Sequence, residues 1–317
     1  MVANVENIVF ADDSATPWHG LGGTLSREAP LDQWRVEAGL DWTAERNPMY
    51  LADGTRVKGN DLLTRSDNSF QLGIVTPRYN IVQPSEIIEF YRDLTQEMGY
   101  TMETAGSLAS GKRIWALART GESTRIMGQD QVDGYLLLAT SFDGTLATSA
   151  MHTSVRVVCQ NTLYMAIGEA GENGVRIPHR AEFSAESVKQ ELGIYGGVWE
   201  TFEEDANLMA NKKVTKAEAV QFLLDVMYPK GDYPDLGAKD GRATKNIMRL
   251  INTYESGVGQ QTKSAEGTVW GLVNGVTRFV DHESLAHSND SRLQSAWFGK
   301  GKTMKANAYQ LGLAMAA

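Results

Sequence analysis

Two short turns constrain the fold most, because they divide the middle of the chain into strands that pair most readily as hairpins. Small and polar residues dominate positions 109–111 (Ala-Ser-Gly) and 142–144 (Phe-Asp-Gly), and runs typical of strands flank both turns. The four runs predicted as strands are 101–108, 112–119, 132–140 and 146–158. Consecutive strands joined by short turns lie antiparallel. The sequence therefore predicts an antiparallel β-sheet in the middle of the chain.

Helical patterns lie on both sides of this predicted sheet. Apolar residues recur at helical spacing within 85–98, and a short helix is expected over 161–167, so that Met151–Ile167 runs from strand into helix. Thr215 and Glu218 match a capping box. The later predicted helices are 185–193, 198–210, 215–227, 244–254, 268–282 and 303–315. The fold class predicted is α+β: an antiparallel β-sheet core with packing helices, followed by a mainly α-helical C-terminal region.

The predicted organisation has three parts. Residues 1–80 form an N-terminal irregular/β segment, in which Asp53-Gly54 marks a hairpin turn. Residues 81–180 form the α+β core, and residues 181–317 form the mainly helical C-terminal region.

Composition limits the cellular compartment in which the protein is expected and the kinds of binding site that it can contain. The 317 residues carry a formal charge of −9, which argues against a surface coated in cations for duplex DNA, although basic residues predominate after Gly237. The single cysteine, Cys159, excludes internal disulfides and sites with several cysteine ligands. The chain shows no signal-peptide pattern and no apolar run near the ~20 residues that span a bilayer. A cytoplasmic protein without membrane contact is therefore expected.

Catalytic and cofactor motifs are weak. The run Gly299–Thr303 (Gly-Lys-Gly-Lys-Thr) resembles part of a phosphate loop, but Ala296 stands where that motif needs glycine, so a flexible basic loop is the favoured interpretation. Asp281, His282 and Glu283 are adjacent, and neighbouring residues on a helix point to different sides. We therefore predict no catalytic residues, no metal ligands and no cofactor.

The predicted strand 112–119 carries the most suggestive chemistry. Alternation places Arg113, Trp115 and Arg119 on one face, and cations beside an indole suit the phosphates and bases of a single nucleic-acid strand. Arg156 occupies a comparable place in the later strand. The nucleic-acid-binding candidates are Arg113, Trp115, Arg119 and Arg156, with a basic flank of Lys300, Lys302 and Lys305. The alternative is that Trp115 belongs to the core and the arginines pair with nearby acids.

Four stretches resemble a family of phage- and plasmid-borne proteins known as domain of unknown function nine-three-two. They are Ser141–Gly144, Val155–Leu163 (Val-Arg-Val-Val-Cys-Gln-Asn-Thr-Leu), Gly267–Asn274 and Pro17–Gly22. The resemblance covers most of the chain. It implies a protein of a bacterial mobile element and supplies no catalytic residues.

A second resemblance concerns the order of the elements. A helix, an antiparallel hairpin sheet and a further helix resemble the core of the Rad52-like single-strand annealing proteins of phages. That resemblance implies a ring or filament that binds single-stranded DNA along a basic groove without nucleotide or metal. The acidic net charge departs from this pattern unless basic residues gather on one rim.

Three hypotheses for function follow. The first is a phage or plasmid DNA-metabolism protein that binds single-stranded DNA as an annealing or recombination-type homo-oligomer in the bacterial cytoplasm. The second is a protein that binds and counters a host defence or restriction protein through the acidic segment 184–225. The third is an enzyme whose site is assembled from distant residues.

Overall fold

The computed structural model describes two compact units, and each contains several separate segments of the chain. The described residues are 8–12, 22–158, 161–164, 174–194, 197–237 and 241–317. Unit 1 comprises residues 1–121, 135–152 and 167–196, and unit 2 comprises residues 122–134, 153–166 and 197–317. The described residues form helices, a large sheet that is mostly antiparallel and a second, three-stranded sheet. This content confirms the predicted α+β class.

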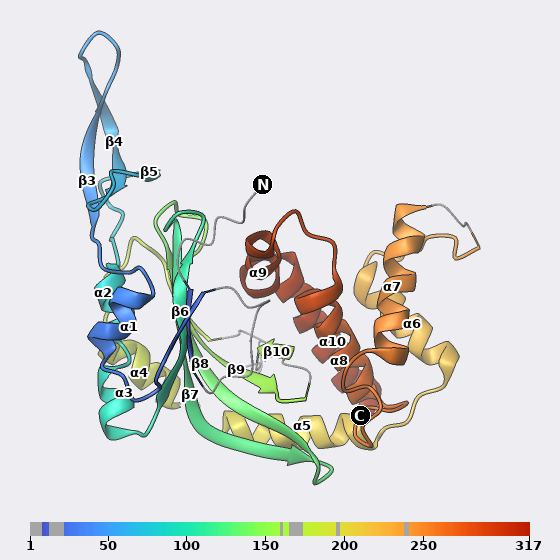
Figure 1. Ribbon diagram of the computed structural model, residues 1–317. Coiled ribbons are helices and arrows are strands. Elements are labelled where there is room, and N and C mark those ends of the chain that lie inside the picture. The colour runs from blue at the N-terminus through green and yellow to red at the C-terminus, as the bar shows by residue number, and fades with distance from the viewer. Residues whose placement is uncertain (1–7, 13–21, 159–160, 165–173, 195–196, 238–240) are drawn as a thin grey trace. The chain divides into compact units, whose positions relative to one another are not determined.

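The main sheet has the strand order β10-β9-β8-β7-β6-β1-β2, with β11 also pairing with β9 (Figure 1). Its strands are β1 (Ile8–Ala11), β2 (Gly23–Leu25), β6 (Thr101–Leu108), β7 (Arg113–Ile126), β8 (Asp130–Ser141), β9 (Thr148–Arg156), β10 (Asn161–Tyr164) and β11 (Val175–Ile177). Strands β6 to β9 are neighbours in sequence order, as the two hairpin turns predict. Only the pair β1 and β2 is described as parallel.

In unit 1, short helices lie against one face of the sheet (Figure 1). They are α1 (Leu31–Glu37), α2 (Pro84–Glu89), α3 (Arg92–Glu97) and α4 (Ala185–Ile194). Trp34 and Ile87 from the helices pack with Ile114, Ala116 and Leu138 from the sheet. Burying such apolar surface is the main source of stability.

The predicted helix 85–98 is two helices rather than one. The helix is interrupted at Phe90 and Tyr91, between α2 and α3, and both of these side chains are buried. The Tyr91 hydroxyl lies 2.7 Å from the carbonyl oxygen of Ala116 and 3.0 Å from that of Leu136. This phenol therefore anchors the helical layer to the sheet, at the place where helical periodicity predicts an unbroken helix.

A second sheet in unit 1 has the order β3-β4-β5, with β3 (Ala44–Tyr50), β4 (Arg56–Arg65) and β5 (Gln71–Val75). Strands β3 and β4 form a hairpin around the predicted Asp53-Gly54 turn, where Gly54 has a φ of 82° that glycine adopts without strain. Near its base, Leu63 and Leu72 join the core of unit 1.

Unit 2 is mainly helical after residue 197. Its helices are α5 (Val198–Asn211), α6 (Lys216–Met227), α7 (Arg242–Ser256), α8 (Val269–Arg278), the π-helix η2 (Phe279–Glu283), α9 (Asn289–Phe298) and α10 (Lys300–Ala316). The predicted capping box of Thr215 and Glu218 opens α6. Helix α8 is buried along its length and packs against α5, α7 and α10.

Two predicted local structures are wrong. Residues 161–164 of the predicted helix 161–167 form strand β10, which pairs with β9 in antiparallel register, Thr162 opposite Val155. Thr162, Leu163 and Tyr164 suit a strand, and pairing with β9 outweighs the capping signal of Asn161. The predicted loop Gly299–Thr303 is instead the start of α10, because Gly301 lets the helix lie against Val280, Ser295 and Ala296. Cys159, residues 165–167 and Pro17–Leu21 lie outside the described residues.

Gly271 in α8 offers a direct test of the helical packing. A Cβ atom there would lie 1.9 Å from the carbonyl oxygen of Ala265, so we expect Gly271→Ala to lower the unfolding free energy by about 3 kcal/mol. Alanine would otherwise favour the helix by about 1 kcal/mol, so the sign alone is informative. Urea denaturation measures the change. Gly23→Ala is the control, because its Cβ would meet no atom within 4 Å. Equal effects of the two variants would contradict this packing.

Candidate nucleic-acid interface

The strand predicted to offer a nucleic-acid-binding face is buried on both faces. Trp115 is only 1% exposed, and Ile114 and Ala116 on the other face are fully buried. The half-buried Arg119 lies 3.9 Å from a carboxylate oxygen of Glu103 and donates to the Tyr135 hydroxyl. The alternative interpretation of this strand therefore fits both residues: Trp115 is buried in the protein, and Arg119 lies near an acid. Arg113, also half-buried, donates to the Thr145 hydroxyl at 2.7 Å.

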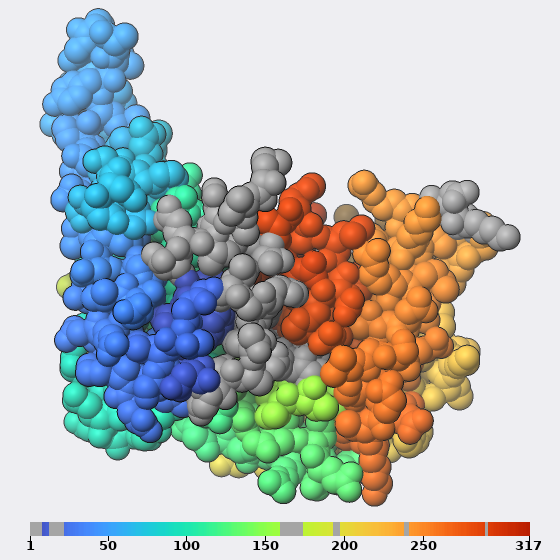
Figure 2. Space-filling view, in the orientation of Figure 1, coloured from blue at the N-terminus to red at the C-terminus, as the bar shows by residue number. Residues whose placement is uncertain are grey.

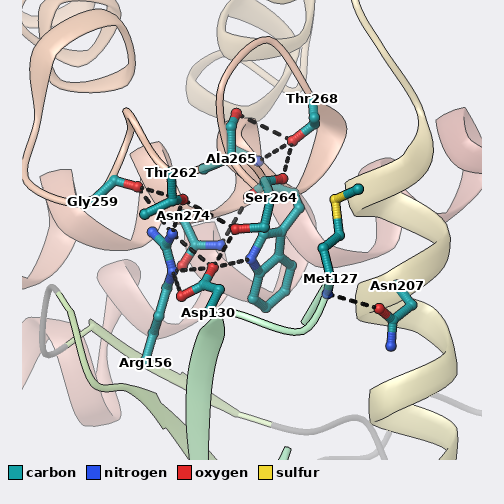
Figure 3. Close-up of polar contacts among 12 residues, drawn as sticks. Met127, Asp130, Arg156, Asn207, Gly259, Thr262, Ser264, Ala265, Thr268 and Asn274 are labelled. Atoms are coloured by element: carbon teal, nitrogen blue, oxygen red, sulfur yellow. Dashed lines mark hydrogen bonds and ion pairs between the residues drawn. The ribbon is translucent and has the colours of Figure 1, made fainter. Parts of the chain in front are cut away.

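Arg156 belongs to a buried polar network in unit 2 (Figure 3). Its Nε lies 2.7 Å and 2.8 Å from the two oxygens of Asp130, and its Nη2 donates to the Gly259 carbonyl and the Thr262 hydroxyl. Asp130 also accepts from Ser264 at 2.6 Å and from the Trp270 indole at 3.2 Å. The Arg156 and Asp130 side chains are only 2% and 1% exposed, so a phosphate in solvent cannot reach this guanidinium.

Lys305 is also inside the protein, in unit 2. Its ammonium lies 2.8 Å from Asp281 of the π-helix, and both side chains are 0% exposed. Burial lowers the pKa of Lys305, and the Asp281 carboxylate opposes that shift. Asp281 is therefore an interior carboxylate paired with Lys305. Lys300 is exposed and Lys302 half-buried in the first turn of α10.

The seven predicted residues are not brought together within one unit. Arg113, Trp115 and Arg119 belong to unit 1, whereas Arg156 and the three lysines belong to unit 2. Of the sheet residues, Arg113 and Arg119 keep part of their surface in solvent. Through Thr145, Arg113 contacts the turn between β8 and β9, which belongs to a different surface of unit 1 that the sequence did not single out.

Three loops meet in unit 1 around a stacked pair of rings, which we name the Tyr79–His179 corner. The two ring centroids are 4.3 Å apart with an angle of 19° between the planes. The Tyr79 hydroxyl donates to the Ser141 carbonyl at 2.7 Å, and burial raises the pKa of this phenol well above its usual range. His179 Nε2 lies 2.8 Å from the Leu146 carbonyl oxygen. These contacts tie the loops 76–80 and 178–180 to the turn that joins β8 and β9.

The loops that hold this stacked pair also carry cationic residues. Arg46 donates from Nη2 to the Tyr79 carbonyl at 2.7 Å and from Nη1 to Asp61 at 3.0 Å. Arg78 and Arg180 are exposed on the two loops. Near the same turn, the Lys112 backbone carbonyl accepts from the Phe142 N–H, and Arg113 binds Thr145.

A partly exposed aromatic ring, Phe70, lies near Lys112. The Lys112 ammonium is 6.0 Å from the centre of this ring. Strand β5 approaches the turn closely, since a Cβ on Gly73 would lie 2.7 Å from Asp143 Cα. The nearby carboxylate of Asp143 accepts from Thr145, and that of Asp61 from Arg46. This part of unit 1 therefore carries guanidinium groups on its loops and a partly exposed ring, the kinds of group that bind phosphates and stack on bases.

Sequence reasoning missed Phe70, Arg78, Tyr79, His179 and Arg180. One signal was available: Pro77-Arg78-Tyr79 and Pro178-His179-Arg180 each combine a proline, an arginine and a ring in a loop. Loops on a rigid scaffold often carry binding residues. Nothing local indicates that these two segments, about a hundred positions apart, meet in space.

Other kinds of site find no support among the described residues. They contain no group of three or more His, Cys, Asp or Glu side chains that could hold a metal ion. No helix in the described ranges is both long enough and apolar enough to span a membrane.

The buried pair Lys305–Asp281 can be tested by a double-mutant cycle. Lys305→Met leaves a buried carboxylate without its main partner, so we expect it to lower the unfolding free energy by about 3–5 kcal/mol. Adding Asp281→Leu removes that charge and should recover much of the loss. The control is Lys216→Met, which breaks an exposed pair with Glu255 at 3.8 Å and should cost less than about 1 kcal/mol. Simple additivity of the two buried substitutions would contradict the coupling.

Comparison with known proteins identifies the family. No curated protein and no solved structure matches the chain. The family model described as "Domain of unknown function (DUF932)" matches residues 71–297. The match includes β5, β6 to β9 and most of the helical region, and it begins after the β3–β4 hairpin. Because it spans more than two thirds of the chain, the protein belongs to the DUF932 family.

Proposed function

We propose that the protein binds single-stranded DNA at the Tyr79–His179 corner, as a phage- or plasmid-encoded protein of DNA metabolism. The observations that carry the proposal are the exposed Arg78 and Arg180 on the two loops of the Tyr79–His179 stack, and Arg113 bound to Thr145 on the turn that this stack contacts. Phe70, a partly exposed ring, lies near Lys112. Guanidinium groups bind phosphates, and an exposed ring stacks on a base only where that base is unpaired. Single strands are therefore favoured over duplex DNA.

The charges of the chain shape the expected affinity. A net charge of −9 repels nucleic acid at long range, so binding depends on a few short-range contacts at the corner. Weak, strongly salt-dependent binding by one copy is the result, and several copies on one strand strengthen it. This fits an annealing or recombination-type oligomer in the bacterial cytoplasm, the setting that the resemblance to phage and plasmid proteins implies.

A second candidate function is binding to a host defence or restriction protein. Its support is the set of exposed acids on α4, α5 and α6, namely Glu186, Glu191, Glu200, Glu204 and Glu218. Nuclease-treated host lysate separates the candidates: a partner captured by the protein, and lost with Glu200→Lys/Glu204→Lys, favours this function. Retention of the same partner by that variant would contradict it.

Binding to oligonucleotides tests the first candidate directly. We expect fluorescence anisotropy to show binding of single-stranded oligonucleotides that weakens steeply with salt. Combining Arg78→Ala, Arg113→Ala and Arg180→Ala should weaken it on the order of tenfold or more at low salt and reduce the slope of log K against log salt by about 2.

The matched control is Lys216→Ala, which removes one exposed cation from unit 2 and should change little. Phe70→Ala should reduce single-strand binding more than duplex binding, since stacking needs an unpaired base. Absent binding, salt-independent binding, or an unaffected triple variant would contradict the assignment.

A further inference from the structure

His179 contacts its neighbours in the Tyr79–His179 corner through both nitrogens of its ring. Its Nε2 lies 2.8 Å from the carbonyl oxygen of Leu146, in the turn between β8 and β9. Its Nδ1 lies 3.3 Å from the carbonyl oxygen of Asn80, in the loop 76–80. The Asn80 N–H in turn donates to the His179 carbonyl. One imidazole ring therefore connects three separate segments of unit 1.

The protonation of this ring decides how many of these contacts are hydrogen bonds. A carbonyl oxygen only accepts hydrogen bonds, so each ring nitrogen needs its own hydrogen in order to bind one. A neutral imidazole carries one N–H, and its other nitrogen then directs a lone pair at an oxygen. Only the imidazolium form of His179 therefore donates to both Leu146 and Asn80.

Loss of the proton affects one of the two contacts more than the other. A neutral ring with its hydrogen on Nε2 keeps the shorter contact, to the Leu146 carbonyl at 2.8 Å. It then loses the longer contact, to the Asn80 carbonyl at 3.3 Å. Deprotonation therefore releases a bond to the loop 76–80, while the ring stays bound to the turn between β8 and β9.

The Tyr79 ring also favours the charged form of His179. The two ring centroids are 4.3 Å apart and the planes are nearly parallel, and the face of an aromatic ring attracts a cation at this distance. Burial raises the pKa of the Tyr79 hydroxyl, which stays protonated and donates to the Ser141 carbonyl. The stack therefore places an imidazolium against a neutral phenol.

Charged groups on the neighbouring segments act on this ring in opposite directions. The Asp143 carboxylate, in the turn between β8 and β9, favours a positive ring. Arg46 donates to the Tyr79 carbonyl from β3, and Arg78 and Arg180 lie on the two loops, so these three cations disfavour a further positive charge. Phosphate groups bound to the guanidinium groups offset that repulsion. The same phosphates therefore favour protonation of the ring.

Solvent reaches this part of unit 1. Strand β5, which leads into the loop 76–80, lies at the base of the projecting β3–β4 hairpin (Figures 1 and 2). Thr76, Pro77 and Arg78 are exposed, and His179 keeps part of its surface in solvent. Histidine is the side chain whose ordinary charge change falls between about pH 5 and 8. A proton can therefore exchange with water without opening the core.

We propose that a proton on His179 fastens the loop 76–80 to the loop 178–180 and to the turn between β8 and β9, and that phosphates bound at the corner favour this fastened form. His179 acts as a positioning residue, because carbonyl oxygens occupy both of its nitrogens. The coupling is reciprocal, so single-stranded DNA binds more tightly at lower pH and its binding takes up protons. The coupling to DNA rests on the proposed function, whereas the fastening of the loops does not.

The fastening is tested first in the full chain without DNA. In NMR spectra of the ¹⁵N-labelled chain, lowering the pH from about 8 to about 5.5 should protonate both ring nitrogens of His179. The amide signal of Ile81 should move over the same range, because its peptide group contains the Asn80 carbonyl.

Two variants show whether this movement belongs to His179. His179→Gln should abolish it, whereas His287→Gln, which changes an exposed histidine of unit 2, should preserve it. A His179 ring that still lacks a second proton at about pH 5.5, or an Ile81 signal that moves equally in His179→Gln, would overturn the fastening.

Binding of single-stranded oligonucleotides at constant salt tests the coupling. Between about pH 8 and 5.5 the affinity of the natural chain should rise about fivefold more than that of His179→Gln, which is the effect of one hydrogen bond. His287→Gln should behave as the natural chain does. Equal pH dependence in the natural chain and in His179→Gln, both folded by circular dichroism, would overturn the coupling.

The outcomes also separate this inference from the proposed function. DNA binding whose pH dependence does not change in His179→Gln would contradict the coupling and leave the nucleic-acid site standing. Fastening seen by NMR in a chain that binds no oligonucleotide would support the fastening and contradict the proposed function.

Discussion

The buried Asp130 carboxylate constrains unit 2 because donors from three separate segments of the chain must converge on it. It lies at the start of β8 and accepts from Arg156 at the end of β9, and from Ser264 and Trp270 more than 130 positions later. A buried charge costs several kcal/mol unless donors surround it, so these donors all have to be in place together. The same requirement joins Lys305 to Asp281, where the π-helix brings the acid to α10. Apolar packing fills unit 2, and these buried charges require β8, β9, α8 and α10 to bring their partners together.

Unit 1 separates its scaffold from its candidate binding groups. Buried side chains such as Tyr91 and Trp34 fasten the helices to the sheet, and the exposed groups lie on the connecting loops. The Tyr79–His179 stack contacts the turn between β8 and β9 through backbone carbonyl groups, so the loops that carry Arg78 and Arg180 have a defined backbone position. Preorganised groups lose less entropy when a ligand binds. A small corner can therefore be selective although the chain as a whole is acidic.

The sequence predicted those parts of the fold that depend on interactions between residues close together in the chain, such as turns and helix caps. Glycine in the turns at 109–111 and 142–144 indicated the hairpins around β6 to β9, and the capping box at Thr215 located α6. Alternation in β7 could not show which face meets water, and Trp115 on one face and Ile114 on the other are both buried. The partner of Lys305 is 24 positions away and that of Arg156 is 26, so their burial was invisible from neighbouring residues. The corner was missed for the same reason, since Tyr79 and His179 meet only in the folded chain.

The path of the chain has a practical consequence. It passes from one unit to the other five times, and β7, β8 and β9 each contribute residues to both. No single cut separates the units, and a fragment ending anywhere between residues 121 and 197 lacks pieces of at least one of them. Expressing either half alone would leave strands without their neighbours and apolar surface in water. Functions in this family should therefore be mapped by substitution within the whole chain, and a truncation that abolishes an activity says little about where that activity resides.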